Sequence, residues 1–184
     1  MAIPDYQTLM LPVLRLAGKG EWRVPEAAEK IADEFSLSPE ERDELLPSGK
    51  QRIFHNRIHW AKFYMSKAGL IESPKRGLFT ASAAGKALLS QNPPSIDNET
   101  LNQFPAFVEF RLGNSKESGT AVKQAAVAAS ASEATPEEQI DAAQAILRSA
   151  LSSDVLQRIL DNSPSFFENV IVELLVAMGV WGNA

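Results

Sequence analysis

The 184-residue chain contains no cysteine, which excludes disulfides and thiolate metal sites. Long apolar runs are also missing: the most apolar stretch, Val170–Trp181, contains Glu173 and is too short to cross a bilayer. The first residues, Met-Ala-Ile-Pro-Asp-Tyr, lack the basic and apolar regions of a signal peptide. We therefore expect a soluble protein of the cytoplasm with no membrane partner.

The composition is that of an ordinary folded protein, with one local exception in charge. Apolar residues make up 45% of the chain and charged residues 22%, and the net charge is −5 with a pI near 5.1. Between residues 50 and 76, however, one carboxylate, Glu72, stands among seven cations. These cations are Lys50, Arg52, Arg57, Lys62, Lys67, Lys75 and Arg76. A basic zone on an acidic protein predicts a surface for a polyanion, because neutralised phosphates release their counterions.

The basic zone has the order of a winged helix-turn-helix. Residues 51–68 form a predicted helix whose apolar stripe recurs at helical spacing, and Gly69 follows as its C-terminal stop. The stripe consists of Phe54, Ile58, Ala61, Met65 and Ala68. A strand at 70–72, a turn at 73–77 and a return strand at 78–80 complete the pattern. We predict a mainly α winged helix with a small β-hairpin wing and a C-terminal helical extension.

The flanking segments predict three regions, at residues 1–94, 95–134 and 135–184. In the first, helices are expected after Asp5, over 24–35, after the capping box at Ser38 and over 81–89. The elements over 24–44 are acidic, so we expect them to face away from nucleic acid. In the second, a short helix precedes an extended piece at 106–111, and 113–134 reads as a flexible linker.

The third region should be helical. A capping box at Thr135 predicts a helix to about residue 150, with a further helical piece over 155–160. Ser163-Pro164 begins a last helix with a wide apolar face.

Seven residues are candidates for contacts with double-stranded DNA. Five are placed on the side of the 51–68 helix roughly opposite the apolar stripe, and two at the tip of the wing. They are Arg52, His55, Asn56, His59, Lys62, Lys75 and Arg76. Arginine and lysine match guanine edges and phosphates, and asparagine matches adenine. The alternative is that this is a solvated face of a winged helix that binds protein.

Other chemistry on this helix is poorly supported by the sequence. His55 and His59 stand four residues apart, a spacing that suits a metal pair, but further ligands would have to come from elsewhere. We therefore expect no metal site, no cofactor and no catalytic Ser/His/Asp set. Trp60 and Tyr64 are expected to be partly buried, each with its polar tip satisfied.

Several motifs resemble the Mrr restriction endonuclease family. They are Asn56-Arg57-Ile58-His59-Trp60-Ala61, Lys67-Ala68-Gly69-Leu70, Lys75-Arg76-Gly77, Ala83-Ala84-Gly85, and the opening Pro4-Asp5-Tyr6 with Leu11-Pro12-Val13-Leu14-Arg15. Ser163-Pro164-Ser165-Phe166-Phe167-Glu168 and the run from Leu174 to Gly179 are similar to the first helix of the family's nuclease domain. The resemblance implies a winged-helix DNA-binding domain joined to a magnesium-dependent nuclease that often acts on modified DNA.

The resemblance also implies catalytic residues that this sequence does not reach. In the family, the nuclease helix leads to an Asp, then a Glu or Gln, then a Lys, which hold the metal and polarise water. The sequence ends at Ala184 before such a block, so we expect DNA binding without cleavage. Two alternatives remain: a part of a modification-dependent restriction enzyme, or a protein-interaction adaptor. The apolar last helix should pack on the 135–160 helices or pair with a second copy as a homodimer.

Overall fold

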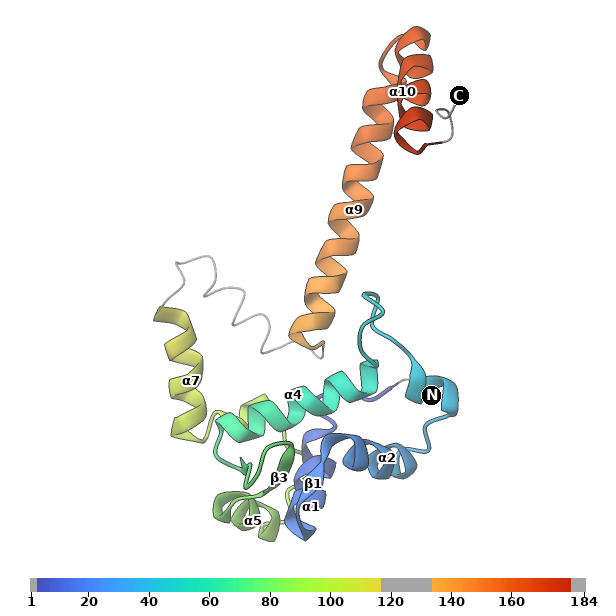
Figure 1. The fold of residues 1–184 in the computed structure, drawn as a ribbon. Helices are drawn as coiled ribbons and strands as arrows, with labels where there is room; N and C mark the ends of the chain where they lie inside the picture. The colour runs from blue at the N-terminus through green and yellow to red at the C-terminus, as the bar shows by residue number, and fades with distance from the viewer. Residues whose placement is uncertain (1–2, 117–133, 180–184) are drawn as a thin grey trace. The chain divides into compact units, whose positions relative to one another are not determined.

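The computed structural model describes residues 3–116 and 134–179, which fall into two compact units at residues 1–139 and 140–184. Within the described residues the chain is mainly helical, with one small antiparallel sheet (Figure 1). The helices are α1 (Met10–Lys19), α2 (Val24–Glu34), α3 (Pro39–Asp43), α4 (Ile53–Lys67), α5 (Ala83–Ser90), α6 (Asn98–Leu101), α7 (Pro105–Lys116), α9 (Pro136–Leu160) and α10 (Pro164–Ala177). The predicted mainly α winged-helix fold is confirmed.

The sheet has three strands in the order β1-β3-β2. The wing consists of β2 (Ile71–Glu72) and β3 (Leu78–Ala81), paired antiparallel with Ile71 opposite Ala81. Gly77 has a φ of 82° just before β3, a left-handed value that suits glycine in this turn. The third strand, β1 (Trp22–Arg23), pairs with the other edge of β3. This strand was not predicted, because a two-residue strand carries no periodic signal.

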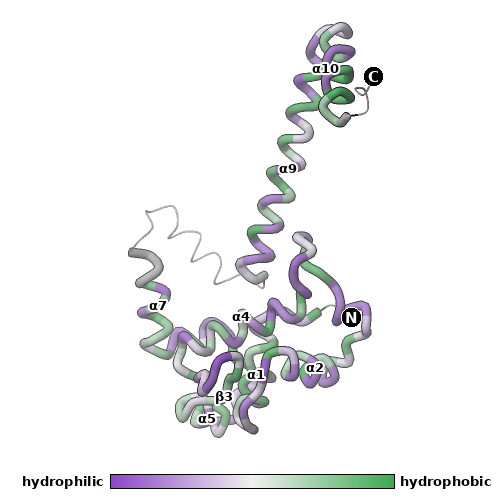
Figure 2. The backbone as a smooth tube through the Cα atoms, in the orientation of Figure 1, coloured by the Kyte–Doolittle hydropathy of each residue, from purple (hydrophilic) through white to green (hydrophobic). Residues whose placement is uncertain are grey.

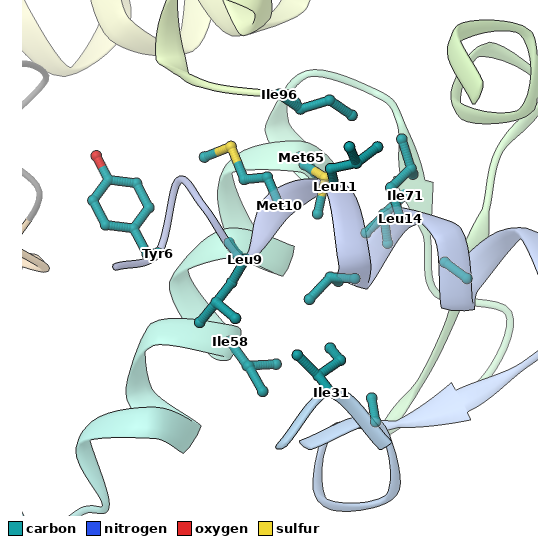
Figure 3. Packing of buried hydrophobic residues seen from close by; sticks show 14 of the residues in the cluster. Tyr6, Leu9, Met10, Leu11, Leu14, Ile31, Ile58, Met65, Ile71 and Ile96 are labelled. Atoms are coloured by element: carbon teal, nitrogen blue, oxygen red, sulfur yellow. The ribbon is translucent and has the colours of Figure 1, made fainter. Parts of the chain in front are cut away.

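The core of the first unit is built between α1, α2 and α4, with β3 and α5 closing one side. Leu9, Leu14, Ile31 and Ile58 all belong to this buried cluster (Figure 3). All five residues of the predicted apolar stripe of α4 are buried, as expected from their spacing. This burial fixes the rotation of α4 and therefore decides which of its side chains face outward.

Residues 96–112 differ from the sequence prediction. The expected extended piece at 106–111 is wrong, because these residues lie inside α7. Phe107 is 2% exposed within the core of the first unit, so helical packing outweighs the weak local pattern. Residues 113–116 of the predicted linker also belong to α7, and 117–133 lie outside the described residues.

Two predicted helix starts are confirmed atom by atom. At α3, the Ser38 N–H donates to Glu41 Oε2 at 2.8 Å, and the Glu41 N–H donates to Ser38 Oγ at 3.3 Å. At α9, Thr135 and Glu138 form the same reciprocal pair at 2.6 and 3.3 Å. The helix that follows Thr135 runs unbroken to Leu160, where the sequence suggested two pieces.

The second unit, from residue 140, exposes many large apolar side chains. Those on α9 and α10 include Leu147 at 70% and Leu174 at 53% exposed. Figure 2 shows the mixture of apolar and polar residues along both helices. In the described residues, most of the apolar surface of α9 and α10 is therefore uncovered. No helix of the described residues is long and apolar enough to cross a membrane.

Candidate nucleic-acid interface

The start of α4 is held in place by the segment after α3. The Ile53 N–H donates to Glu44 O at 2.8 Å, and Leu45 forms a β-bridge with Arg52. Arg52 also forms an ion pair with Asp43 at 3.0 Å between Nη2 and Oδ1. Both side chains are about half exposed or more, at 47% and 67%, so the pair contributes little to stability and can exchange for another anion.

The outward side of α4 borders a groove that we call the α4 groove. Its volume is about 580 Å³, and it is lined by Gln51, Arg52, His55, Asn56, His59, Trp60, Phe63 and Glu137. Four of the seven candidate residues meet in this groove: Arg52, His55, Asn56 and His59. The structure thus joins cationic, imidazole and amide groups along one flank of α4, which is a chemistry suited to phosphates and base edges.

The placement of Asn56 on the exposed side was wrong. Asn56 is 2% exposed and both ends of its amide are bonded within the chain. Its Nδ2 donates to Gln51 Oε1 at 3.0 Å, and its Oδ1 accepts from the Thr135 hydroxyl at 2.8 Å. The cause is tertiary: Thr135 lies 79 positions away along the chain, so helical periodicity could not reveal it.

The other candidates lie beyond the groove. Lys62 is half-buried, with its Nζ 5.8 Å from the centroid of the Phe79 ring. Lys75 and Arg76 are exposed in the turn between β2 and β3. Among the described residues, neither wing cation forms an ion pair, so both remain available to an anion.

The surroundings of both histidines lower their pKa and so favour the neutral imidazole. Partial burial, and then the neighbouring Arg52, lowers the pKa of His55 below its usual value. Partial burial, and then Lys62, does the same to the pKa of His59. The described residues contain no cluster of three or more metal-ligating side chains. The α4 groove therefore presents two imidazoles, the Arg52 guanidinium and the Glu137 carboxylate.

The contacts of the residues that flank this groove were not predicted from the sequence. Arg57 Nε and Nη2 both donate to Glu138 Oε1, at 3.0 and 2.7 Å, and Arg57 Nη1 donates to the Ile3 and Pro4 carbonyls. The Trp60 indole N–H donates to Glu137 Oε2, which confirms the expected half-buried ring with a satisfied tip. Burial also raises the pKa of the neighbouring Tyr64 to about 12. The capping box at Thr135 could be recognised in the sequence. Its docking on α4 could not, because that contact is tertiary.

Comparison of the sequence with known proteins identifies the family to which the chain is related. The family model described as "Mrr N-terminal domain" matches residues 6–91, the segment that contains α1 to α5 and the whole sheet. Similarity to an Mrr protein of Escherichia coli (strain K12) extends over the entire chain. The chain belongs to the Mrr family. The family resemblance inferred from the motifs is thereby confirmed.

The relative is described as "Type IV methyl-directed restriction enzyme EcoKMrr" and is 31% identical over 189 residues. The match covers 100% of this Mrr-family chain and 62% of the relative, so the chain spans less than two thirds of that protein's length. No solved structure matches the chain significantly.

Proposed function

We propose that this Mrr-family protein binds double-stranded DNA through α4 and the β2–β3 wing. The observation that carries the proposal is the division of charge in the first unit. Arg52, Lys62 and the wing pair Lys75–Arg76 follow one another along α4 and the wing, whereas α2 and α3 are acidic. A polyanion is attracted to the first surface and repelled by the second.

The winged-helix arrangement allows these cations to contact a DNA duplex. A helix of the size of α4 fits the major groove, and a hairpin next to it reaches the backbone or the minor groove. The residues proposed to contact the major groove of DNA are Arg52, His55, His59 and Lys62. Asn56 is proposed to contact a base edge once its amide is released from Gln51 and Thr135. Lys75 and Arg76 are proposed for the phosphate backbone.

Fluorescence anisotropy with a short labelled duplex tests the proposal. Binding should weaken as salt rises from about 50 to 200 mM, and each neutralised phosphate should add about 0.9 to the slope of log K against log salt. Equal titrations with methylated and unmethylated duplexes show whether the modification is read. Absence of binding at the lowest salt would refute DNA binding.

A second candidate is that the chain is the DNA-binding part of a modification-dependent restriction enzyme. The full-length similarity to a protein described as a methyl-directed restriction enzyme favours it. The coding sequence beyond the codon for Ala184 is the direct test, since an Asp followed by a Glu/Gln-x-Lys block would supply catalytic residues. A third candidate, a protein-binding adaptor, is favoured by the ion pair between Arg52 and Asp43, which partly neutralises the basic face.

A further inference from the structure

A short acidic segment near the C-terminal end of the first unit is docked on α4, the helix proposed to bind DNA. It comprises Thr135, Pro136, Glu137 and Glu138, the capping box and first turn of α9, and we call it the acidic turn. It is within the same compact unit as α4. Thr135 is fully buried, and the Glu138 side chain is 13% exposed, so the turn is packed in place.

Three side chains of the acidic turn each engage a different residue of α4. The Thr135 hydroxyl bonds Asn56, Glu138 accepts two hydrogen bonds from Arg57, and Glu137 accepts the indole N–H of Trp60. Residues 56, 57 and 60 lie on neighbouring turns of one helix flank. Three hydrogen-bonded residue pairs therefore join the acidic turn to one side of α4.

Two of the residues that the turn occupies, Asn56 and Arg57, carry groups of the kind that bind nucleic acid. Asn56 carries the donor and acceptor that match adenine, and the bond from Thr135 takes its acceptor. The Arg57 guanidinium is a fork suited to phosphate oxygens, and a carboxylate takes two of its donors instead. Glu137 also lines the α4 groove, where its charge opposes an incoming phosphate.

We propose that the acidic turn is an intramolecular competitor of DNA, so that Thr135, Glu137 and Glu138 must leave α4 before the duplex seats fully. This rests on the proposed DNA-binding function. Free protein holds the turn closed through its two carboxylates, which substitute for phosphates. Duplex binding and turn docking oppose one another, so weakening the turn strengthens binding to DNA.

The first test removes one charge and keeps the hydrogen-bond acceptor. Glu137→Gln leaves an amide oxygen for the Trp60 indole but takes the negative charge out of the groove. Duplex affinity should rise roughly fivefold or more. Glu34→Gln is the matched control, because Glu34 is an exposed carboxylate of α2 outside the α4 groove, and its affinity should stay within about twofold of wild type. Equal gains in both variants, or no gain in Glu137→Gln, would overturn the proposal.

The second test locks the turn reversibly, which is feasible because the chain has no native cysteine. Combining Asn56→Cys with Thr135→Cys, at two positions whose side chains are hydrogen-bonded, allows a disulfide to form between the turn and α4. Oxidised protein should bind duplex roughly tenfold or more weakly than the same protein after reduction. Loss of the Asn56 amide is common to both forms and cancels in the comparison.

Wild-type binding separates failure of this inference from failure of the proposed function. If wild type binds duplex with salt dependence and the oxidised and reduced forms bind equally, the competitor role is wrong and DNA binding stands. If neither wild type nor Glu137→Gln binds, DNA binding and the competitor role fail together. Salt-dependent binding by wild type, with tighter binding by Glu137→Gln and by the reduced form than by the oxidised form, supports both.

Discussion

At the residue scale, Asn56 and Trp60 show where helical periodicity stops being informative. Their neighbours Phe54 and Ile58 are buried as their spacing predicts, because the core lies on a fixed side of α4. Asn56 is buried by a different contact, the docking of Thr135. Burial by a distant segment depends on tertiary structure, so the sequence could suggest candidate residues by type but could not give their accessibility.

Protonation of His55 and His59 should strengthen DNA binding at mildly acidic pH. Both pKa values are lowered in the free protein, and phosphate oxygens would favour the imidazolium, so the pKa values are higher in the complex. Affinity therefore rises as pH falls below the ordinary value of about 6.5 towards the depressed values. The charged groups around them are Arg52, Glu29 and Asp43 for His55, and Lys62 and Glu137 for His59.

Anisotropy titrations across this pH range check the prediction. A double His55→Gln, His59→Gln variant should lose the extra pH dependence and keep its folding. Circular dichroism must accompany the titrations, because a depressed histidine pKa means that folding stability is present above the ordinary pKa and declines as pH falls through the folded-state value. Identical pH profiles for wild type and variant would show that neither imidazole approaches phosphate.

At the element scale, local signals predicted the structure where the determining atoms are close in sequence. The capping boxes at Ser38 and Thr135 began helices as expected, and Gly69, with a φ of 76°, ended α4. Strand β1 and helix α7 were missed because pairing with β3 and burial of Phe107 decide them. The wing could be predicted from its turn and alternation, whereas the third strand of its sheet could not.

Helix α5 depends on a close approach at Gly85. A Cβ there would lie 2.2 Å from the Leu70 carbonyl oxygen and 3.1 Å from Leu14 Cδ1. Gly85→Ala should lower the free energy of unfolding by about 2 kcal/mol, since overpacking outweighs the gain in helix propensity. Urea denaturation measures it, with Lys86→Ala on the exposed side of α5 as the control. An unchanged midpoint for Gly85→Ala would mean that α5 can move away from Leu70 without cost.

The wing should bind phosphates in a way that carries no sequence information. Replacing both Lys75 and Arg76 with alanine should weaken binding to all duplexes alike and flatten the salt slope by about 1 for each phosphate that is no longer neutralised. Lys30→Ala is the matched control, because Lys30 is exposed on the acidic helix α2. A wild-type salt slope in the wing variant would remove the wing from the DNA surface.

At the scale of the whole molecule, the two units make different demands on a partner. The first unit has a buried core and a division of charge between its faces, which suits a polyanion. From residue 140 onward, the described part of the second unit buries none of its large apolar side chains fully. Apolar surface on this scale favours association, and pairing with a second copy remains a prediction.

Light scattering after size exclusion checks for such a homodimer. The expected mass is twice that of the 20.1-kDa chain, and Ile171→Asp on α10 should reduce it to one chain by placing a charge in the apolar face. Glu168→Gln on the same helix should leave the mass unchanged. A monomeric wild type whose residues after 139 are rapidly removed by protease would contradict self-association.

Amide hydrogen exchange with and without a saturating duplex tests the central proposal of DNA binding through α4 and the wing. We predict added protection over residues 52–67 and 71–81 and none over 24–43, because the acidic helices face away from phosphate. We also predict faster exchange at 135–138 as the acidic turn leaves α4. Protection concentrated on α2 and α3, or no change at α4 when the duplex is bound, would contradict it.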